Sequence, residues 1–233
     1  MLLGVRPLVF LARLLVFFAL TFLLWEPFAP VYTRLLAACT QVAISATELF
    51  GPEPTRLATT VFSRGEGIFF MHKRFPGYAP PGVPSDWVQA NMVLLLPLML
   101  ATPAPSWRTR FIRLAIALGA ALALQVLGLV FAIKVTWSHG LGPFSVEYYG
   151  SAQRKFYQFA DAFFQSFDTQ LFPVAIWAGV HFPQLLAWVQ GRPPEAAEAK
   201  KKVAKTEGKS PRSDRGASTR SQVPGPKSDR KKI

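Results

Sequence analysis

Four blocks of apolar side chains alternate with more polar segments along the chain, and these blocks set the expected architecture. They lie at about residues 8–25, 88–103, 114–135 and 170–189. A helix needs about 20 consecutive apolar residues to cross the hydrocarbon core of a bilayer, and each block reaches or approaches that length. The pattern therefore predicts an all-α membrane protein with four transmembrane helices.

Two segments between the blocks have the spacing of amphipathic helices, in which apolar residues recur every three or four positions. In residues 31–50 the apolar positions form one stripe, and in residues 146–167 aromatic side chains share one face. Both segments are expected to lie at the membrane surface or against the helix bundle. The stripes are Val31, Leu35, Ala38, Val42 and Leu49 in the first segment and Tyr149, Phe156, Phe159, Phe163 and Phe167 in the second.

A small β-hairpin is expected between the first two apolar blocks. Residues 57–62 and 68–74 are rich in β-branched and aromatic side chains, and a glycine-containing turn at residues 63–67 separates them. The following segment, residues 75–84, is rich in proline and glycine and is predicted to be irregular. Residues 26–87 would thus hold one amphipathic helix and one hairpin.

Composition agrees with a membrane protein and separates a tail from the rest of the chain. The 233 residues are 51% hydrophobic and carry a formal net charge of +13. Residues 191–233 hold +8 of that charge and almost no large apolar side chains. Such a segment cannot bury enough apolar surface to fold, so residues 191–233 are predicted to be a disordered basic tail that follows a membrane domain at residues 1–190.

The basic residues also predict which way the protein faces. With four spans, the amino terminus, the turn between the second and third spans and the tail all lie on one side of the membrane. Arg6 and Arg13 lie near the amino terminus, and Arg108, Arg110 and Arg113 lie at that turn. Short basic segments stay in the cytoplasm, which places both termini inside and residues 26–87 and 136–169 outside a bacterial inner membrane.

The first block also fits a secretory signal, because Arg6 and Arg13 would be its basic region. However, Trp25-Glu26-Pro27 after the apolar core offers no small-residue cleavage site. We therefore interpret residues 8–25 as a membrane span, with Arg13 reaching back to the lipid headgroups.

Three outward residues are the candidates for catalysis. Cys39, the single cysteine, could act as a nucleophile with His72 or His139 as its base, as in a membrane-embedded cysteine transpeptidase or peptidase. No sequence spacing supports that pairing. A lone cysteine beside an apolar stripe is more often a small buried hydrophobic residue, so a non-catalytic role for Cys39 is favoured.

Three polar residues fall inside the predicted spans: Asn91, Gln125 and His181. Polar side chains at that depth usually hydrogen-bond between helices, and an intramembrane histidine suggests a role. A transport or channel subunit, the third class considered, would need more intramembrane charges than the chain has. The histidines lack metal-ligand spacing and no nucleotide-binding motif is present, so no metal and no cofactor are expected.

The tail has an electrostatic interpretation. Lys200, Lys201 and Lys202 follow the last span closely, and lysines near an anionic leaflet contribute about 1 kcal/mol each to membrane-surface binding. Anionic lipid headgroups are therefore the expected partners of the tail. Nucleic acid is ranked lower, because no aromatic side chains alternate with the lysines to stack on bases.

A family resemblance adds to this picture. The run Asn91 through Leu96-Pro97-Leu98-Met99-Leu100-Ala101-Thr102-Pro103, followed by Trp107-Arg108 and a long apolar helix, resembles the integral membrane proteins that accompany exosortases, the bacterial sorting transpeptidases. Leu171-Phe172-Pro173-Val174-Ala175-Ile176-Trp177 adds to the resemblance. Cys39 is followed by Thr40-Gln41, whereas the catalytic cysteine of exosortases is followed by Ser-Gly. The resemblance implies a non-catalytic accessory protein in surface-protein sorting, with a membrane protein as partner.

Overall fold

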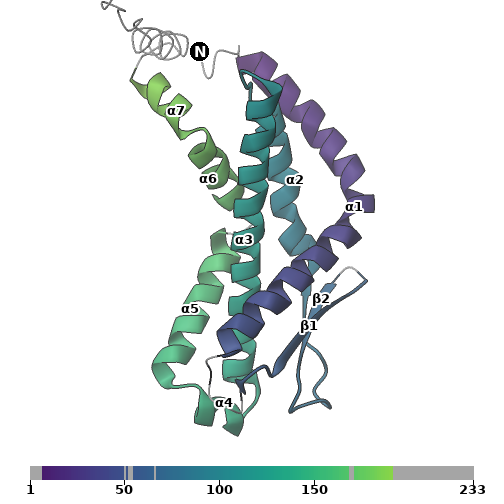
Figure 1. The fold of residues 1–233 in the computed structure, drawn as a ribbon, viewed down its shortest axis with the longest axis vertical. Coiled ribbons are helices and arrows are strands. Elements are labelled where there is room, and N and C mark those ends of the chain that lie inside the picture. The colour runs from purple at the N-terminus through teal and green to yellow at the C-terminus, as the bar shows by residue number, and fades with distance from the viewer. Residues whose placement is uncertain (1–6, 50, 52–54, 66, 168–170, 191–233) are drawn as a thin grey trace, which may run out of the picture. The chain divides into compact units, whose positions relative to one another are not determined.

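The computed structural model describes residues 7–49, 51, 55–65, 67–167 and 171–190. The predicted tail, with Lys200, Lys201 and Lys202, lies outside these residues, as does Arg6. The described chain is mostly helical with one small sheet (Figure 1). Its elements are α1 (Pro7–Leu49), β1 (Thr59–Arg64), β2 (Gly67–His72), β3 (Gly82–Pro84), α2 (Ser85–Ala101), α3 (Trp107–Gly140), α4 (Pro143–Tyr148), α5 (Ser151–Phe167), α6 (Leu171–Val180) and α7 (Phe182–Val189).

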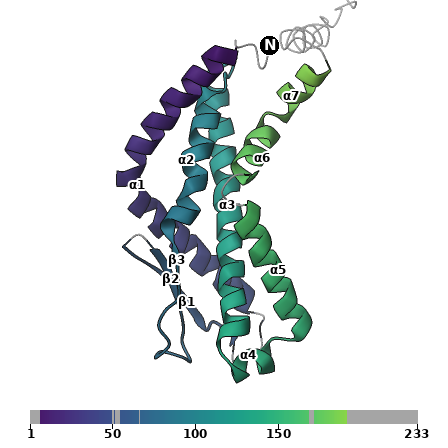
Figure 2. The ribbon, with the colours of Figure 1, turned by 180° about the vertical axis from the view of Figure 1, so that it is seen from behind.

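The first predicted span and the first amphipathic segment are one helix. α1 runs for 43 residues and passes through Pro27 and Pro30, where the sequence predicted a break. A proline removes one backbone hydrogen bond and displaces the preceding turn, so it can bend a long helix without ending it. Figures 1 and 2 show α1 bent near its middle.

The apolar stripe predicted for residues 31–50 lies on the exposed face of this part of α1, so of the two placements expected for the segment the stripe itself does not pack against the bundle. Val31 and Val42 are 62% and 72% exposed, whereas Leu36, Ile44 and Glu48 are at most 2% exposed. Lipid accepts apolar side chains on the outside of a helix as readily as a protein core does, so an apolar stripe does not identify the packed face of a membrane helix. The buried face combines apolar side chains such as Leu36 and Ile44 with polar ones such as Thr40 and Glu48.

The predicted hairpin is present, and a third strand extends it. β1 pairs antiparallel with β2, with Thr59 opposite His72 and Arg64 opposite Gly67, and Gly65 in the turn has a φ of 57°. β3 pairs with the other edge of β2, in the segment that was predicted to be irregular. Three residues with Gly and Pro give too weak a pattern to predict a strand.

Two helices, α1 and α3, are long and apolar enough to cross a bilayer by length and composition. The segment predicted as the second span lies mostly in α2, which has 17 residues and is therefore shorter than the roughly 20 residues of a typical membrane-spanning helix. α3 begins earlier than predicted, because Ser106 accepts a hydrogen bond from the backbone N–H of Thr109 and caps the helix. Arg108, Arg110 and Arg113 therefore lie on the first turns of α3 and not in the preceding turn.

The last predicted span is two short helices rather than one. α6 ends at Val180, His181 forms a turn, and α7 begins at Phe182. Pro183, at the second position of α7, is tolerated there because the first helical turn needs no backbone donor. The segment 146–167 is likewise divided, since α4 ends at Tyr148 and α5 begins at Ser151.

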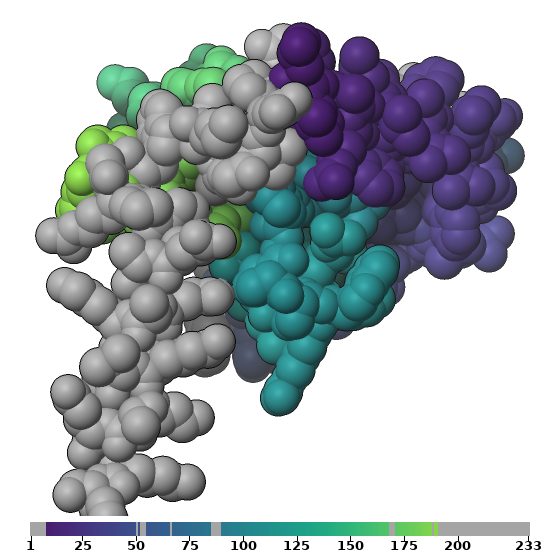
Figure 3. Space-filling model, turned by 90° about the horizontal axis from the view of Figure 1, so that it is seen from above, coloured from purple at the N-terminus to yellow at the C-terminus, as the bar shows by residue number. Residues whose placement is uncertain are grey.

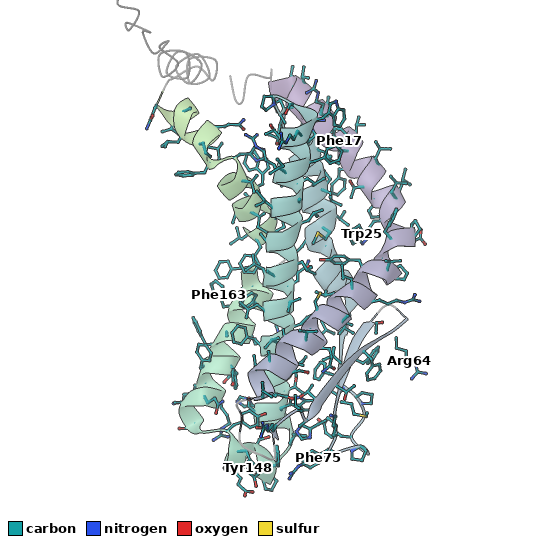
Figure 4. The ribbon with its side chains drawn as sticks, in the orientation of Figure 1. Phe17, Trp25, Arg64, Phe75, Tyr148 and Phe163 are labelled. Atoms are coloured by element: carbon teal, nitrogen blue, oxygen red, sulfur yellow. The ribbon has the colours of Figure 1, made fainter. Side chains whose placement is uncertain are left out.

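α5 packs along α3 through a narrow contact. A β-carbon placed at Gly128 of α3 would lie 3.2 Å from Cδ1 of Phe164, and Ala160 and Phe164 are the buried residues of α5. Phe156, Phe159 and Phe163 are 41% to 70% exposed, and the ring of Phe156 also contacts Phe131 of α3 at a centroid distance of 5.8 Å. Figure 4 shows Phe163 at the outer side of α5.

Candidate functional site

The described residues form one buried ion pair, at the junction of α1, β1 and α3. Glu48, on the last turn of α1, is 2% exposed, and its Oε1 lies 3.5 Å from Nζ of Lys134 on α3. The carboxylate also accepts hydrogen bonds from both groups of Thr59 at the start of β1: the backbone N–H donates to Oε2 over 3.1 Å, and the hydroxyl donates to Oε1. Three donors thus satisfy one buried charge, as the cost of desolvation requires.

Aromatic rings enclose this ion pair on the side of the sheet. Trp137, 1% exposed and one turn after Lys134, donates from Nε1 to Oγ1 of Thr59 over 3.0 Å. His72, opposite Thr59 on β2, lies between the rings of Trp137, Phe75 and Phe144 at centroid distances of 5.2 to 5.4 Å. We call Glu48, Thr59, His72, Lys134 and Trp137 the junction cluster.

α1 also caps the free edge of β1. Oε1 of Gln41, two turns before Glu48, accepts a hydrogen bond from the backbone N–H of Val61 over 2.6 Å. Nε2 of Gln41 donates to the carbonyl of Thr59 over 3.4 Å. An uncovered strand edge exposes unpaired backbone N–H and C=O groups. Here the side chains of Gln41 and Glu48 form hydrogen bonds with these groups of β1. α1 therefore covers this edge of the sheet.

The surroundings shift the pKa values of two side chains in or near the junction cluster, His72 and Tyr149. Burial lowers the pKa of His72, and this effect outweighs the attraction of the Glu48 carboxylate. Burial also raises the pKa of Tyr149, with the nearby Glu48 charge acting in the same direction. Nδ1 of His72 accepts a hydrogen bond from the backbone N–H of Arg74 over 3.3 Å, so the neutral ring carries its proton on Nε2. Nε2 has no hydrogen-bond partner among the described residues.

This arrangement joins several elements. The Glu48 carboxylate accepts hydrogen bonds from the backbone N–H and hydroxyl of Thr59 and from the Lys134 ammonium. A second bond set holds α4 in place, where the Ser145 hydroxyl donates to the carbonyl of Trp137 over 2.8 Å and accepts from the backbone N–H of Leu141. The cluster therefore ties α1, α3, α4 and the sheet together.

The structure does not bring the predicted catalytic residues together. Cys39 is half-buried on α1, and within the described part of the chain no hydrogen bond joins it to a histidine. His72 lies inside the aromatic rings. His139 is exposed near the end of α3, with its Nδ1 near the hydroxyl of Ser138 and the carbonyl of Val135. Across the same residues, no three histidine, cysteine, aspartate or glutamate side chains are placed to hold a metal ion.

The predicted intramembrane polar residues are all buried. Gln125 accepts a hydrogen bond from the hydroxyl of Tyr32, which links α3 to α1. His181 shares a 2.9 Å hydrogen bond with the carbonyl of Trp177 and stacks beside its ring. Nε1 of Trp177 donates to the Thr102 hydroxyl over 2.8 Å and so ties α6 to the end of α2. Asn91 is 3% exposed on α2.

The three arginines of α3 have different surroundings. Arg108 is exposed, and the guanidinium of Arg110 lies 5.1 Å from the centre of the Trp107 ring. Arg113 is partly buried, and its Nη1 has no hydrogen-bond partner among the residues described.

Sequence reasoning missed the junction cluster except for His72. Lys134 falls at the far end of the third predicted span, and Glu48 falls off the apolar stripe of residues 31–50, in a segment predicted to lie outside the membrane. Two signals were available: Lys134 is a lone charge late in an apolar helix, and Glu48 is an acid of opposite sign on the segment predicted to lie nearby. Comparisons of the chain with protein-family models, with curated proteins and with solved structures found no match.

Proposed function

We propose that this chain is a non-catalytic integral membrane protein, an accessory or scaffold that packs against a membrane protein partner. The observation that carries the proposal is the junction cluster. The one buried ion pair of the described residues is saturated by internal donors and holds four elements in place. Among the described residues, no hydrogen bond joins Cys39, the candidate nucleophile, to either candidate base.

The exposed aromatic side chains of α5 support the proposal that the chain binds a partner protein. Phe156, Phe159 and Phe163 follow a helical spacing and form an exposed aromatic stripe on α5. Aromatic side chains are enriched where proteins bind one another, because each buries a large area at small entropic cost. We take this stripe as the partner surface, and an exosortase, on the resemblance of the sequence, as the partner.

The placement of the element ends supports a four-crossing topology with both termini cytoplasmic. In Figures 1 and 2 the start of α1, the end of α2, the start of α3 and the end of α7 lie toward one end of this unit. The sheet and α4 lie toward the other end. The proposed orientation thus puts three arginines, Arg13, Arg108 and Arg110, at the cytoplasmic end, where basic residues are enriched in membrane proteins. α2 and the pair α6–α7 would complete the crossings as short or broken helices.

The test is a deletion strain of an exosortase-containing bacterium, complemented with variants of this chain. Cys39→Ala is expected to restore both surface-protein sorting and co-purification with the exosortase. Changing Phe156, Phe159 and Phe163 to serine is expected to abolish both without changing the membrane level of the protein. The matched control changes Lys155 and Gln158, exposed neighbours on α5, to serine and should behave as wild type.

Two results would contradict the proposal. If Cys39→Ala abolished sorting at an unchanged protein level, the transpeptidase or peptidase alternative would replace it. If the phenylalanine variants co-purified with the exosortase as well as the control, the aromatic stripe would not be the partner surface. Loss of function in His181→Leu alone would instead favour the transport alternative.

A further inference from the structure

The bend in α1 leaves an apolar groove on its inner side. The groove has a volume of about 590 Å³, within the range of small-molecule sites, and three helices line it. Figure 4 shows Phe17 and Trp25 on the side of α1 that faces α2. The groove is lined by Thr21, Leu24, Trp25, Phe28, Val31, Tyr32 and Leu35 of α1, Met92, Leu96 and Leu100 of α2, and Leu118, Gly119 and Leu122 of α3.

A second hollow adjoins the groove at Leu100 and carries two arginines. It also measures about 590 Å³, and its lining combines apolar side chains of α1 with Leu100, Arg13 and Arg110. Neither lining contains an aspartate or glutamate, and neither arginine forms an ion pair within the described residues. Figure 3 looks onto this end of the unit, where the start of α1 lies beside α2 and α3.

The combined length of the groove and the adjoining hollow, which share Leu100, matches one leaflet of a bilayer; we call the two together the path. Arg110 and Leu122, at opposite ends of it on α3, are separated by about 18 Å at a rise of about 1.5 Å per residue. Half of a hydrocarbon core that is about 30 Å thick measures about 15 Å. A molecule with its charged group at Arg110 and a hydrocarbon chain reaching Leu122 would therefore fit.

We propose that this path binds an anionic glycerophospholipid of the cytoplasmic leaflet. Its phosphate would accept hydrogen bonds from the guanidinium groups of Arg13 and Arg110, which bind such anions strongly. One acyl chain would lie in the groove between α1 and α3. Two cations without carboxylate partners in the part of the chain that the structure describes favour an anionic occupant over a neutral lipid or a second copy of this basic chain. The inference rests on the membrane placement proposed above, but not on the accessory role.

Native mass spectrometry of the full chain, purified in detergent, tests the site directly. The probes are phosphatidylglycerol and phosphatidylcholine with identical acyl chains. We expect the protein to retain phosphatidylglycerol about tenfold better, a difference of about 1.4 kcal/mol. The measurement needs neither the exosortase nor a sorting assay, so it can fail or succeed independently of the accessory role.

Two pairs of variants locate the lipid. Arg13→Gln with Arg110→Gln should remove the preference for phosphatidylglycerol, whereas Arg108→Gln, on an exposed side chain of the same helix turn, should keep it. Gly119 lines the groove and a β-carbon there meets no atom within 4 Å, so Gly119→Leu should fill the groove without disturbing the fold. Gly179→Leu, at an equally open position on α6 outside the groove, is its control.

Three results would overturn the proposal. Equal retention of the two lipids would remove the role of the arginines. A preference that survives in the Arg13, Arg110 and Gly119 variants would place the lipid elsewhere on the protein. A lipid-free dimer that dissociates in Gly119→Leu but not in Gly179→Leu would identify a second copy as the occupant.

Discussion

Glu48 and Lys134 depend on each other at the scale of single residues. A buried charge is tolerated only while its partner and hydrogen bonds remain, so removing one member leaves the other uncompensated. Glu48→Gln is expected to destabilise the protein by about 3–5 kcal/mol, because it leaves the Lys134 ammonium without a counter-charge. The fall in the thermal unfolding midpoint of the purified protein measures this cost.

The double variant distinguishes loss of pairing from loss of packing. Adding Lys134→Met to Glu48→Gln removes the orphaned charge and keeps an unbranched side chain of similar length. The combined cost should then be smaller than the sum of the two single costs, as for residues in direct contact. Additive costs would show that the two side chains do not interact.

His72 gives the protein a predictable response to acid. Its folded-state pKa lies below the ordinary value of 6.5, because burial opposes protonation. Between the two pKa values the unfolded chain binds more protons than the folded one, so stability falls as pH drops below about 6.5 and levels off below the folded-state pKa. His72→Phe should reduce the loss of stability between about pH 7.5 and about pH 5, measured by thermal unfolding.

The control for His72 is its exposed counterpart. His139→Gln removes a histidine that lies outside the aromatic rings around His72, at an exposed position near the end of α3. An aromatic ring at position 72 would also keep the contacts with Trp137 and Phe144. A pH response that persists in His72→Phe would assign the acid sensitivity to another group.

At the scale of single residues, the sequence alone does not predict contacts between side chains that are far apart along the chain. Single residues were recognised as unusual when they stood alone, as His181 did within an apolar run. The pairing of Glu48 with Lys134 spans 86 positions and depends on how α1 crosses α3. No local pattern contains that information, so the pairing of Glu48 with Lys134 was not predicted.

At the scale of elements, Gly128 sets the distance between α3 and α5. Its missing side chain leaves room for Phe164, and Gly128→Leu would force the two helices apart. The expected cost is about 1–3 kcal/mol, typical of overpacking at a tight contact. Gly119→Leu on the same helix faces open space and should be neutral or stabilising by up to about 1 kcal/mol, because leucine favours helix more than glycine does. Thermal unfolding of both variants under one set of conditions provides the comparison, and equal midpoints would contradict the packing role of Gly128.

Elements were predicted well where a periodic pattern had clear ends. β1 and β2 were found because glycines mark the turn between them. Pro27 and Pro30 were interpreted as a break, although a helix supported by neighbours can continue through prolines. The buried face of α1 was not predicted for a related reason. An amphipathic pattern identifies a buried face only when water is the solvent, whereas lipid accepts apolar side chains on an exposed face.

At the scale of the whole described unit, the two ends of the bundle differ in charge. Arg13, Arg108, Arg110 and Arg113 lie on α1 and α3 toward one end, whereas the junction cluster lies toward the other, where α1 ends against the sheet. The basic end would be held in the cytoplasm, because moving arginines across a bilayer is costly. The sheet and the exposed residues of α4 would then face outward.

Cysteine labelling in intact bacteria tests this orientation, and the single native cysteine simplifies the design. In a Cys39→Ala background, Ser63→Cys introduces a thiol in β1, and Ala104→Cys introduces one in the connection between α2 and α3. A membrane-impermeant maleimide should label position 63 in intact cells and position 104 only after the cells are opened. The reverse pattern would invert the orientation, and labelling of both positions in intact cells would mean that α2 does not cross the membrane. Each introduced cysteine serves as the accessibility control for the other, because both are placed in the same Cys39→Ala protein background.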